Sequence, residues 1–408
     1  MQISDLTNIV LDETFHPCLN LAIKSDTRSV EPNRLARITP RADAAQDAVR
    51  ALRGARSSRP LLLTSPASVN WRSGGLSDPI DITAASDPVW TLDCDRGTAL
   101  ITNEIEAPRL EHDFRVQNLG WDVVRTPWFE ANAPFDAACS YAGVDADRFL
   151  SDVDSIGTNI GADVVGARLA LSAPEREELR ELGLIVGRAL GVGIDSWRPG
   201  DSTDFDIAGV ISESLERHGA KAVCLIVGGD DRLRSMRHPL AIGDVVREAL
   251  MAVVVARRAG LHVAATRTCL AHADDEIVSL MKTVTVVNDA VLDASQCGGT
   301  WGETMEALGR GYARIGQPNA WREHWQGGPI GFEQREFELA PTQHDSPFWS
   351  LPRSRHTAVA WNPSIAGGAK IEDTYLLGDG LELVSATPGW PLEEGPDGTM
   401  RSAMRVLN

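Results

Sequence analysis

Extended apolar runs alternate with amphipathic stretches along most of this sequence. Between residues 34 and 56 the apolar residues recur at three- and four-residue spacing, as they do on one face of a helix. Extended runs follow at residues 60–64, 88–94, 98–103 and 121–127. Because strands that alternate with helices pack as layers, this half of the chain predicts an α/β fold.

A polar stretch rich in Gly and Asp lies between residues 145 and 172, and we place a domain boundary inside it. Ser172, Pro174 and Glu175 then predict the start of a long helix. After Gly316 the chain reads as extended segments joined by Gly and Pro turns. The sequence therefore predicts an irregular arm at residues 1–30, a smaller α/β domain at 31–155 and a larger α+β domain at 156–408.

Composition excludes several classes of protein. The chain has 408 residues, 43% of them hydrophobic, which is enough for sizeable cores without disulfides. Its net charge of -18 repels phosphate backbones, so we expect no nucleic-acid partner. The six cysteines lack the spacing of a zinc cluster or a redox pair. With no long apolar run and no export signal at the N-terminus, we expect no membrane span and a cytoplasmic location.

One run near the C-terminus carries the most specific signal. Residues 360–374 read A-W-N-P-S-I-A-G-G-A-K-I-E-D-T. Other landmarks precede it in order: Arg237-His238-Pro239, Gly243-Asp244, Thr266-Arg267-Thr268 and the run G-F-E-Q-R-E at residues 331–336. Over roughly residues 31–395 the chain resembles the creatinase, prolidase and methionine-aminopeptidase family. The resemblance implies a C-terminal pita-bread domain preceded by a creatinase/prolidase-like N-terminal domain, and a homodimer.

The metal-ligand positions of that family are occupied by other residues here. The resemblance implies that Val253 and Ala264 stand where the family has two ligand aspartates. Gly328 stands where it has a ligand histidine, and Asn362 where it has its first ligand glutamate. Of the family's ligands only Glu372 remains. One carboxylate cannot hold a pair of divalent ions. We therefore expect no metal and no other cofactor. A rival alignment would recruit a ligand from a small group of candidates: His324, His344, His356 or the acidic run at residues 274–276.

Creatinase, a metal-free member of that family, uses a histidine as proton carrier, and the matching residue here is His238. A neutral imidazole can take a proton from water and later give it to a leaving nitrogen. The structural alternative is that His238 and Pro239 form a turn in which the imidazole caps a backbone group.

Several further residues are expected to bind substrate. A buried Glu372 needs a cationic partner, which either a substrate amidine or amine or Arg335 would supply. Asn362 is expected to orient an amide or ureido group. The remaining candidates are Glu336, Arg267 and Trp361, of which Glu336 and Arg267 are equally expected to form a salt bridge with each other.

The function predicted from these residues is a metal-independent hydrolase acting on a non-peptide carbon–nitrogen bond of a small polar substrate. Two alternatives stay open. One is a pita-bread protein that binds a small ligand or partner without turnover, and the other is a lyase or isomerase that uses the same histidine.

Overall fold

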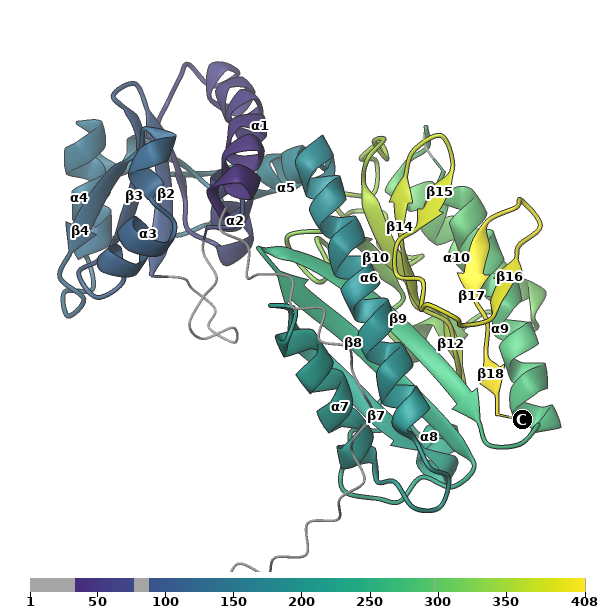
Figure 1. Ribbon diagram of the computed structural model, residues 1–408. Helices are drawn as coiled ribbons and strands as arrows, with labels where there is room; N and C mark the ends of the chain where they lie inside the picture. The colour runs from purple at the N-terminus through teal and green to yellow at the C-terminus, as the bar shows by residue number, and fades with distance from the viewer. Residues whose placement is uncertain (1–33, 77–87, 297, 408) are drawn as a thin grey trace, which may run out of the picture. The chain divides into compact units, whose positions relative to one another are not determined.

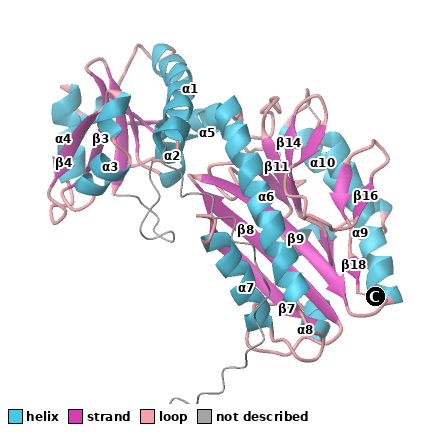
Figure 2. Cartoon of the chain, viewed as in Figure 1, coloured by secondary structure: helices cyan, strands magenta, loops and turns pink. Residues whose placement is uncertain are grey.

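The computed structural model describes residues 34–76, 88–296 and 298–407. Within these ranges helices and strands alternate along most of the chain, coloured cyan and magenta in Figure 2. The mixed α/β fold that the sequence predicts is confirmed. The expected arm at residues 1–30 lies outside the described residues. No helix in the described part of the chain is long and apolar enough to cross a membrane.

Six strands form the first sheet, in the order β4-β3-β2-β1-β5-β6. Their bounds are β1 Leu61–Leu63, β2 Val89–Cys94, β3 Gly97–Asn103, β4 Asp122–Thr126, β5 Leu150–Ser151 and β6 Thr158–Asn159. The helical elements of this region are α1 Arg34–Gly54, α2 Pro66–Ser73, α3 Ala107–Asp113, η1 Val116–Leu119, α4 Ala133–Ala142 and η2 Ala146–Arg148. Successive β3 side chains point to opposite faces, so Leu100 packs with Leu110 of α3 and Ile101 packs with Ala138 of α4. Both faces of the sheet are therefore covered.

The expected division at residue 155 falls between β5 and β6, and the first sheet extends past it. Helices α5 Gly161–Leu169 and α6 Ala173–Ser196 come next. The start of α6 lies where the sequence predicts it, since Ser172 N donates a hydrogen bond of 2.7 Å to Glu175 Oε2. This bond satisfies one of the free donors at the helix start.

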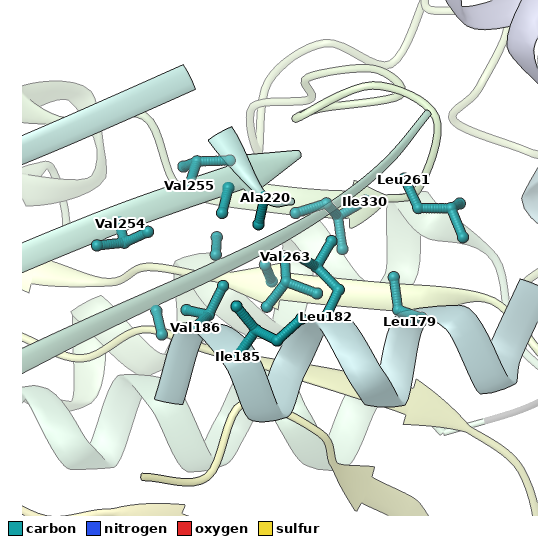
Figure 3. Close-up of a cluster of buried hydrophobic side chains, with 14 of the residues drawn as sticks. Leu179, Leu182, Ile185, Val186, Ala220, Val254, Val255, Leu261, Val263 and Ile330 are labelled. Atoms are coloured by element: carbon teal, nitrogen blue, oxygen red, sulfur yellow. The ribbon is translucent and has the colours of Figure 1, made fainter. Parts of the chain in front are cut away.

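The second sheet has the order β18-β9-β8-β7. Its strands are β7 Lys221–Gly229, β8 Ala249–Arg258, β9 Leu261–Leu270 and β18 Arg405–Val406. Helices α6 and α7 (Asp204–Glu216) lie on one face of it (Figure 1). Figure 3 shows Leu182 and Val186 of α6 against Val263 of β9, inside the larger hydrophobic cluster. Full burial of one such side chain contributes about 1.5–3 kcal/mol, so this layer is a major part of the core.

Two glycines let α6 approach the C-terminal part of the chain. A Cβ atom on Gly183 would lie 2.2 Å from Val384 O, and one on Gly187 would lie 2.2 Å from Ala386 O. No side chain fits at these distances, so the helix packs directly on the backbone there. Ser385 O in turn accepts a hydrogen bond of 2.6 Å from Arg267 Nη2 of β9.

The third sheet has the order β10-β11-β14-β15 and brings the closing motif together. Its strands are β10 Gly327–Ile330, β11 Ala358–Trp361, β14 Asp373–Leu377 and β15 Leu381–Leu383. One face of this sheet, which carries Val359 and Tyr375, packs in one cluster with α9 Asp275–Ala294 and α10 Trp301–Arg314. The other face, which carries Ala358 and Leu376, belongs to the other large cluster. In the antiparallel pair β11–β14, Trp361 lies opposite Asp373. One step further along, Asn362 and Glu372 leave the sheet at the same end.

The remaining elements are short. They are α8 Asp230–Ser235, η3 Ala320–Glu323, the hairpin of β12 Ser364–Ile365 with β13 Ala369–Lys370, and the hairpin of β16 Leu392–Glu394 with β17 Met400–Ser402. Asp274 caps α9, because its Oδ1 accepts a hydrogen bond of 3.0 Å from Ile277 N. The acidic run at residues 274–276 is therefore a helix start.

Candidate active site

Glu372 lies at the centre of the candidate site and is 1% exposed. Its Oε2 accepts a hydrogen bond of 2.8 Å from Thr266 Oγ1, and its Oε1 accepts one of 3.0 Å from Arg335 Nη2. Lys370 Nζ lies 3.5 Å from Oε2. Of the two cationic partners expected for Glu372, the structure thus supplies Arg335, and it adds Lys370.

Glu372 is ionised in this setting. Burial on its own would raise the pKa of the carboxyl group, but the charges of Lys370 and Arg335 and the hydrogen bond from Thr266 act in the opposite direction. The pKa of Glu372 therefore lies below its ordinary value. The site combines one buried anion with two fixed cations.

His238 and His324 form a pair of imidazoles. Their Nε2 atoms are 3.0 Å apart, and their ring centroids are 4.9 Å apart. His238 is exposed and His324 is buried. The indole of Trp325 stacks on His238, with ring centroids 6.0 Å apart and planes 25° apart. The hydrogen bond between the imidazoles and the stacked indole together fix the orientation of the His238 ring.

Both imidazoles are neutral near neutral pH. Burial lowers the pKa of His238, Lys370 lowers it further, and Glu372 raises it. Burial, with help from Lys370 and His238, lowers the pKa of His324 to about 3. Because Lys370 and Glu372 act on both rings, the imidazole pair and the carboxylate belong to one electrostatic unit. A neutral imidazole of this kind can accept a proton.

Asp204 of α7 holds the segment that follows His238. Its side chain is fully buried, and its Oδ1 accepts a hydrogen bond of 2.7 Å from Gly243 N. Its Oδ2 accepts hydrogen bonds of 3.1 Å from Ile242 N and from Arg232 Nη1.

The structural alternative for His238 is a cap on a backbone group, but the hydrogen bond of its imidazole goes to His324.

The residues that the resemblance assigns to the family's metal-ligand positions do not form a set of donors. Val253 and Ala264 pack in the two large hydrophobic clusters. Gly328 has no side chain, and Asn362 contributes only an amide. Over residues 34–76, 88–296 and 298–407, no three His, Cys, Asp or Glu side chains gather closely enough to hold a metal ion. These side chains therefore do not fit a dinuclear metal centre.

The expected salt bridge between Glu336 and Arg267 is wrong. Glu336 Oε2 pairs with Arg168 Nε at 2.6 Å, and Arg267 Nη1 pairs with Asp373 Oδ1 at 2.9 Å. Strand alternation explains the difference, because Thr266 faces Glu372 and the next residue, Arg267, points to the other face. Both side chains are committed to buried structural pairs.

Trp361 is 2% exposed, and its Nε1 donates a hydrogen bond of 2.7 Å to Ser295 Oγ, so its indole belongs to the core. Trp325 is 67% exposed and is the tryptophan that stacks on His238. The other candidate histidines do not join the site: His344 packs against Trp349 with ring centroids 4.3 Å apart, and His356 lines a separate surface pocket with Arg176.

Sequence reasoning missed Lys370 and the pairing role of His324. Lys370 is one of only four lysines in the chain and precedes Glu372 by two residues, which was an available signal. From the sequence, His324 is a candidate only as a metal ligand under the rival alignment. Its contact with His238 joins segments 86 residues apart, which no local pattern reveals.

Comparisons with known proteins place the fold. No family model matches the sequence, and no curated protein matches it either. Among solved structures, the dipeptidase PepE from Mycobacterium ulcerans is similar with a TM-score of 0.69 and 16% identity, over 90% of this chain and 99% of that chain. The Xaa-Pro dipeptidase from Bacillus anthracis has a TM-score of 0.63 and 17% identity, over 89% of this chain and 100% of that one.

A third similar structure is the N-terminal domain of the FACT complex subunit SPT16 from Cicer arietinum (chickpea), with a TM-score of 0.61 and 12% identity, over 87% of this chain and 97% of that chain. The chain therefore has the pita-bread fold of prolidases and Xaa-Pro dipeptidases, with the N-terminal domain that accompanies it, as its resemblance implies. At sequence identities this low, structural similarity shows the fold alone, and the chemistry must be argued from the side chains of the site.

Proposed function

We propose that this protein is a metal-independent hydrolase that cleaves a non-peptide carbon–nitrogen bond in a small polar substrate of the amidine, ureido or amide type. The observation that carries the proposal is the pair of neutral imidazoles, 3.0 Å apart, in the electrostatic field of an ionised Glu372. Two similar structures are named as dipeptidases, which supports hydrolysis of a carbon–nitrogen bond as the reaction class.

His238 is the general acid/base in this proposal. Its neutral imidazole takes a proton from water while the water oxygen forms a bond to the substrate carbon. The imidazolium that forms donates a hydrogen bond to His324 Nε2, which lies 3.0 Å away and stabilises it. His238 then returns the proton to the leaving nitrogen as the carbon–nitrogen bond breaks. The proton balance closes within the site, so no cofactor is required.

Asn362 and Glu372 bind the nitrogen end of the substrate. The Oδ1 atom of Asn362 is buried and has no hydrogen-bond partner among the described residues. An unpaired buried acceptor costs about 1–3 kcal/mol, and a substrate N–H would satisfy it. Because Arg335 and Lys370 already balance its charge, Glu372 accepts a hydrogen bond from an N–H of the same nitrogen group. Arg335, 17% exposed, turns its remaining donors toward a carbonyl or carboxylate oxygen.

Peptidase activity is not part of the proposal. The resemblance implies that proline-directed peptidases of this fold use metal ions to activate water and to polarise the peptide carbonyl. The side chains described for this chain offer no matching set of ligands. We further propose a cytoplasmic homodimer that acts on a small molecule and has no nucleic-acid partner.

The second candidate is a protein that binds a small ligand without turnover. The similarity to a domain of a FACT complex subunit favours it, because that structure's name describes a complex component and no enzyme. A lyase or isomerase that uses His238 in the same position shares every site residue with the first proposal.

The test is a substrate screen with the purified full chain. Amidino, ureido and amide compounds are incubated with the wild type, and release of ammonia or amine is measured. We expect His238→Asn to reduce kcat at least a hundredfold while leaving the substrate Kd within about threefold, since general acid/base catalysis contributes about 10²–10⁴. His356→Asn is the matched control, because His356 lies in another pocket.

Equal turnover by His238→Asn and the wild type would refute the proposal. Binding without turnover in the wild type would favour the second candidate, and products formed without uptake of water would favour the lyase or isomerase.

A further inference from the structure

A pocket with a volume of about 180 Å³ is lined by Arg237 and Glu323, the residues that directly precede His238 and His324 in the sequence. One wall is the segment before His238, including Arg234 and Arg237, and the other is the β12–β13 hairpin from Ser364 to Lys370. Lys370 joins this pocket to the candidate site, since its Nζ also lies 3.5 Å from Glu372 Oε2. The volume is below the 300–1,000 Å³ typical of drug-sized ligands, so the pocket suits a small group.

Positive charge dominates the lining of this pocket. The lining includes three cationic side chains, Arg234, Arg237 and Lys370, and one carboxylate, Glu323. Arg237 pairs with Glu323 at 2.7 Å. Arg234 pairs with Asp274 at 2.5 Å and with Glu276 at 3.6 Å, neither of which is a lining residue. In a chain with a net charge of -18, three cations around one small pocket form a marked local exception. Although each cation has a carboxylate partner, cations outnumber carboxylates on the lining itself, which favours an anion there.

Lys370 is buried, and its ammonium group has N–H donors that Glu372 does not use. Its side chain is 5% exposed, and Glu372 is its ion-pair partner among the described residues. An ammonium group has three N–H donors, and a separation of 3.5 Å is at the long limit for a hydrogen bond. A buried ammonium is costly unless its donors are used, so an anionic oxygen in the pocket would stabilise it.

Ser364 provides an independent observation. It lines the pocket and is 2% exposed, yet its Oγ has no hydrogen-bond partner within the described part of the chain. Its backbone is already satisfied, since Ser364 N and Ser364 O each lie 3.1 Å from the hydroxyl of Tyr312. Ser364 and Lys370 lie opposite each other in the hairpin, so the free hydroxyl and the ammonium come from paired positions.

We propose that this pocket is a binding site for a small oxyanion, in which Lys370 and Arg237 supply the positive charge and the Ser364 hydroxyl donates a hydrogen bond. The ligand chemistry is a carboxylate or phosphate group, held either as part of a substrate or as a free anion. Because Arg237 and Glu323 directly precede His238 and His324, an anionic group bound here would hold the rest of a substrate near His238. The oxyanion site does not depend on turnover and is tested without it.

The probe is inorganic phosphate, added to the full chain at constant ionic strength with chloride as reference. We expect a saturable rise in Tm for the wild type, because a ligand that binds only the folded state stabilises it. Ser364→Ala should weaken phosphate binding about tenfold, the value of one hydrogen bond to a charged ligand. This variant removes a hydroxyl that has no partner, so the Tm of the free protein should not fall.

Ser354→Ala is the matched serine control, since Ser354 bonds Thr357 at 3.0 Å outside the pocket. Arg237→Gln should also weaken phosphate binding, whereas Arg355→Gln, on the exposed surface, should not. The proposal is overturned if phosphate raises Tm no more than chloride, or if Ser364→Ala and Arg237→Gln bind phosphate as the wild type does. Once a substrate is known, competition by phosphate identifies the bound group as part of the substrate, and activation identifies a free effector; both outcomes support the site.

Discussion

Arg335 donates a hydrogen bond of 3.0 Å to the buried carboxylate of Glu372. The two residues come from the segment after β10 and the segment between β13 and β14. Because Lys370 flanks the same carboxylate, the negative charge at the centre of the site is neutralised by the protein itself. This relationship leads to the first two predictions.

Arg335→Gln should lower the free energy of unfolding by about 1–3 kcal/mol. The substitution removes one of two cations from a buried carboxylate, and Lys370 limits the loss. Urea denaturation at pH 7 measures the change. Arg355→Gln is the control, since Arg355 and its partner Asp379 are 55% and 95% exposed and such pairs contribute little. Equal losses for the two variants would contradict the account of Glu372.

Glu372 should make the protein sensitive to acid. Its folded-state pKa lies below the ordinary value of 4.5, so its contribution to stability is present above that value and is lost as the pH falls through the folded pKa. The wild type should therefore lose stability more steeply than Glu372→Gln below about pH 5. Urea midpoints of both proteins at pH 7, 5 and 4 provide the measurement. Parallel pH profiles would show that Glu372 is not held ionised by its neighbours.

His324 should add a second pH dependence in a higher range. Its pKa falls from an ordinary 6.5 to about 3 in the folded state, so between these values the unfolded chain binds the extra proton. Stability must then decrease as the pH falls below 6.5. Replacement by Gln should reduce the loss of stability between pH 7 and pH 5 by about 1–2 kcal/mol. His344→Gln serves as the control, and an unchanged pH profile in His324→Gln would contradict a buried neutral imidazole.

Glu336→Gln should destabilise the fold and leave the chemistry of the site intact. The change leaves Arg168, whose side chain is 6% exposed, without its ionic partner, which costs about 3–5 kcal/mol. Tm and denaturant midpoints should fall, while phosphate binding at the oxyanion pocket should persist in the folded fraction. Glu382→Gln is the matched control, because Glu382 and its partner Arg180 are 49% and 39% exposed.

Elemental analysis should find no stoichiometric manganese, cobalt or zinc in the purified protein. Treatment with a chelator should leave Tm unchanged, since a metal that binds only the folded state would otherwise stabilise it. The reason is the donor set, in which Val253, Ala264 and Gly328 cannot act as ligands. One or more ions per chain, with a fall in Tm on chelation, would require a different set of ligands.

Much of the architecture could be predicted from residue patterns. The period of apolar residues located α1 and α6, and the Ser172–Glu175 pair located the start of α6. The order of short motifs predicted that the segments carrying Asn362 and Glu372 belong to one site, and the register of β11 with β14 places them at one end of the sheet. These features depend on local spacing, which a sequence displays directly.

The contacts that could not be predicted depend on which way each side chain faces. Arg267 and Asp373 lie next to Thr266 and Glu372 in sequence but point to the opposite face, where they pair with each other. The expected partner, Glu336, reaches Arg168 of α5, which is 168 positions away along the chain. Trp361 is subject to the same rule, since it faces the core while Asn362 follows it out of the sheet.

The lysine and arginine that flank Glu372 also restrict how this scaffold can be re-engineered. Aspartates introduced at positions 253 and 264, a histidine at 328 and a glutamate at 362 would supply the ligands that the resemblance implies. An incoming dication would nevertheless meet two tethered positive charges beside Glu372. Any attempt to convert the protein into a metalloenzyme must therefore neutralise Arg335 and Lys370 as well as supply ligands.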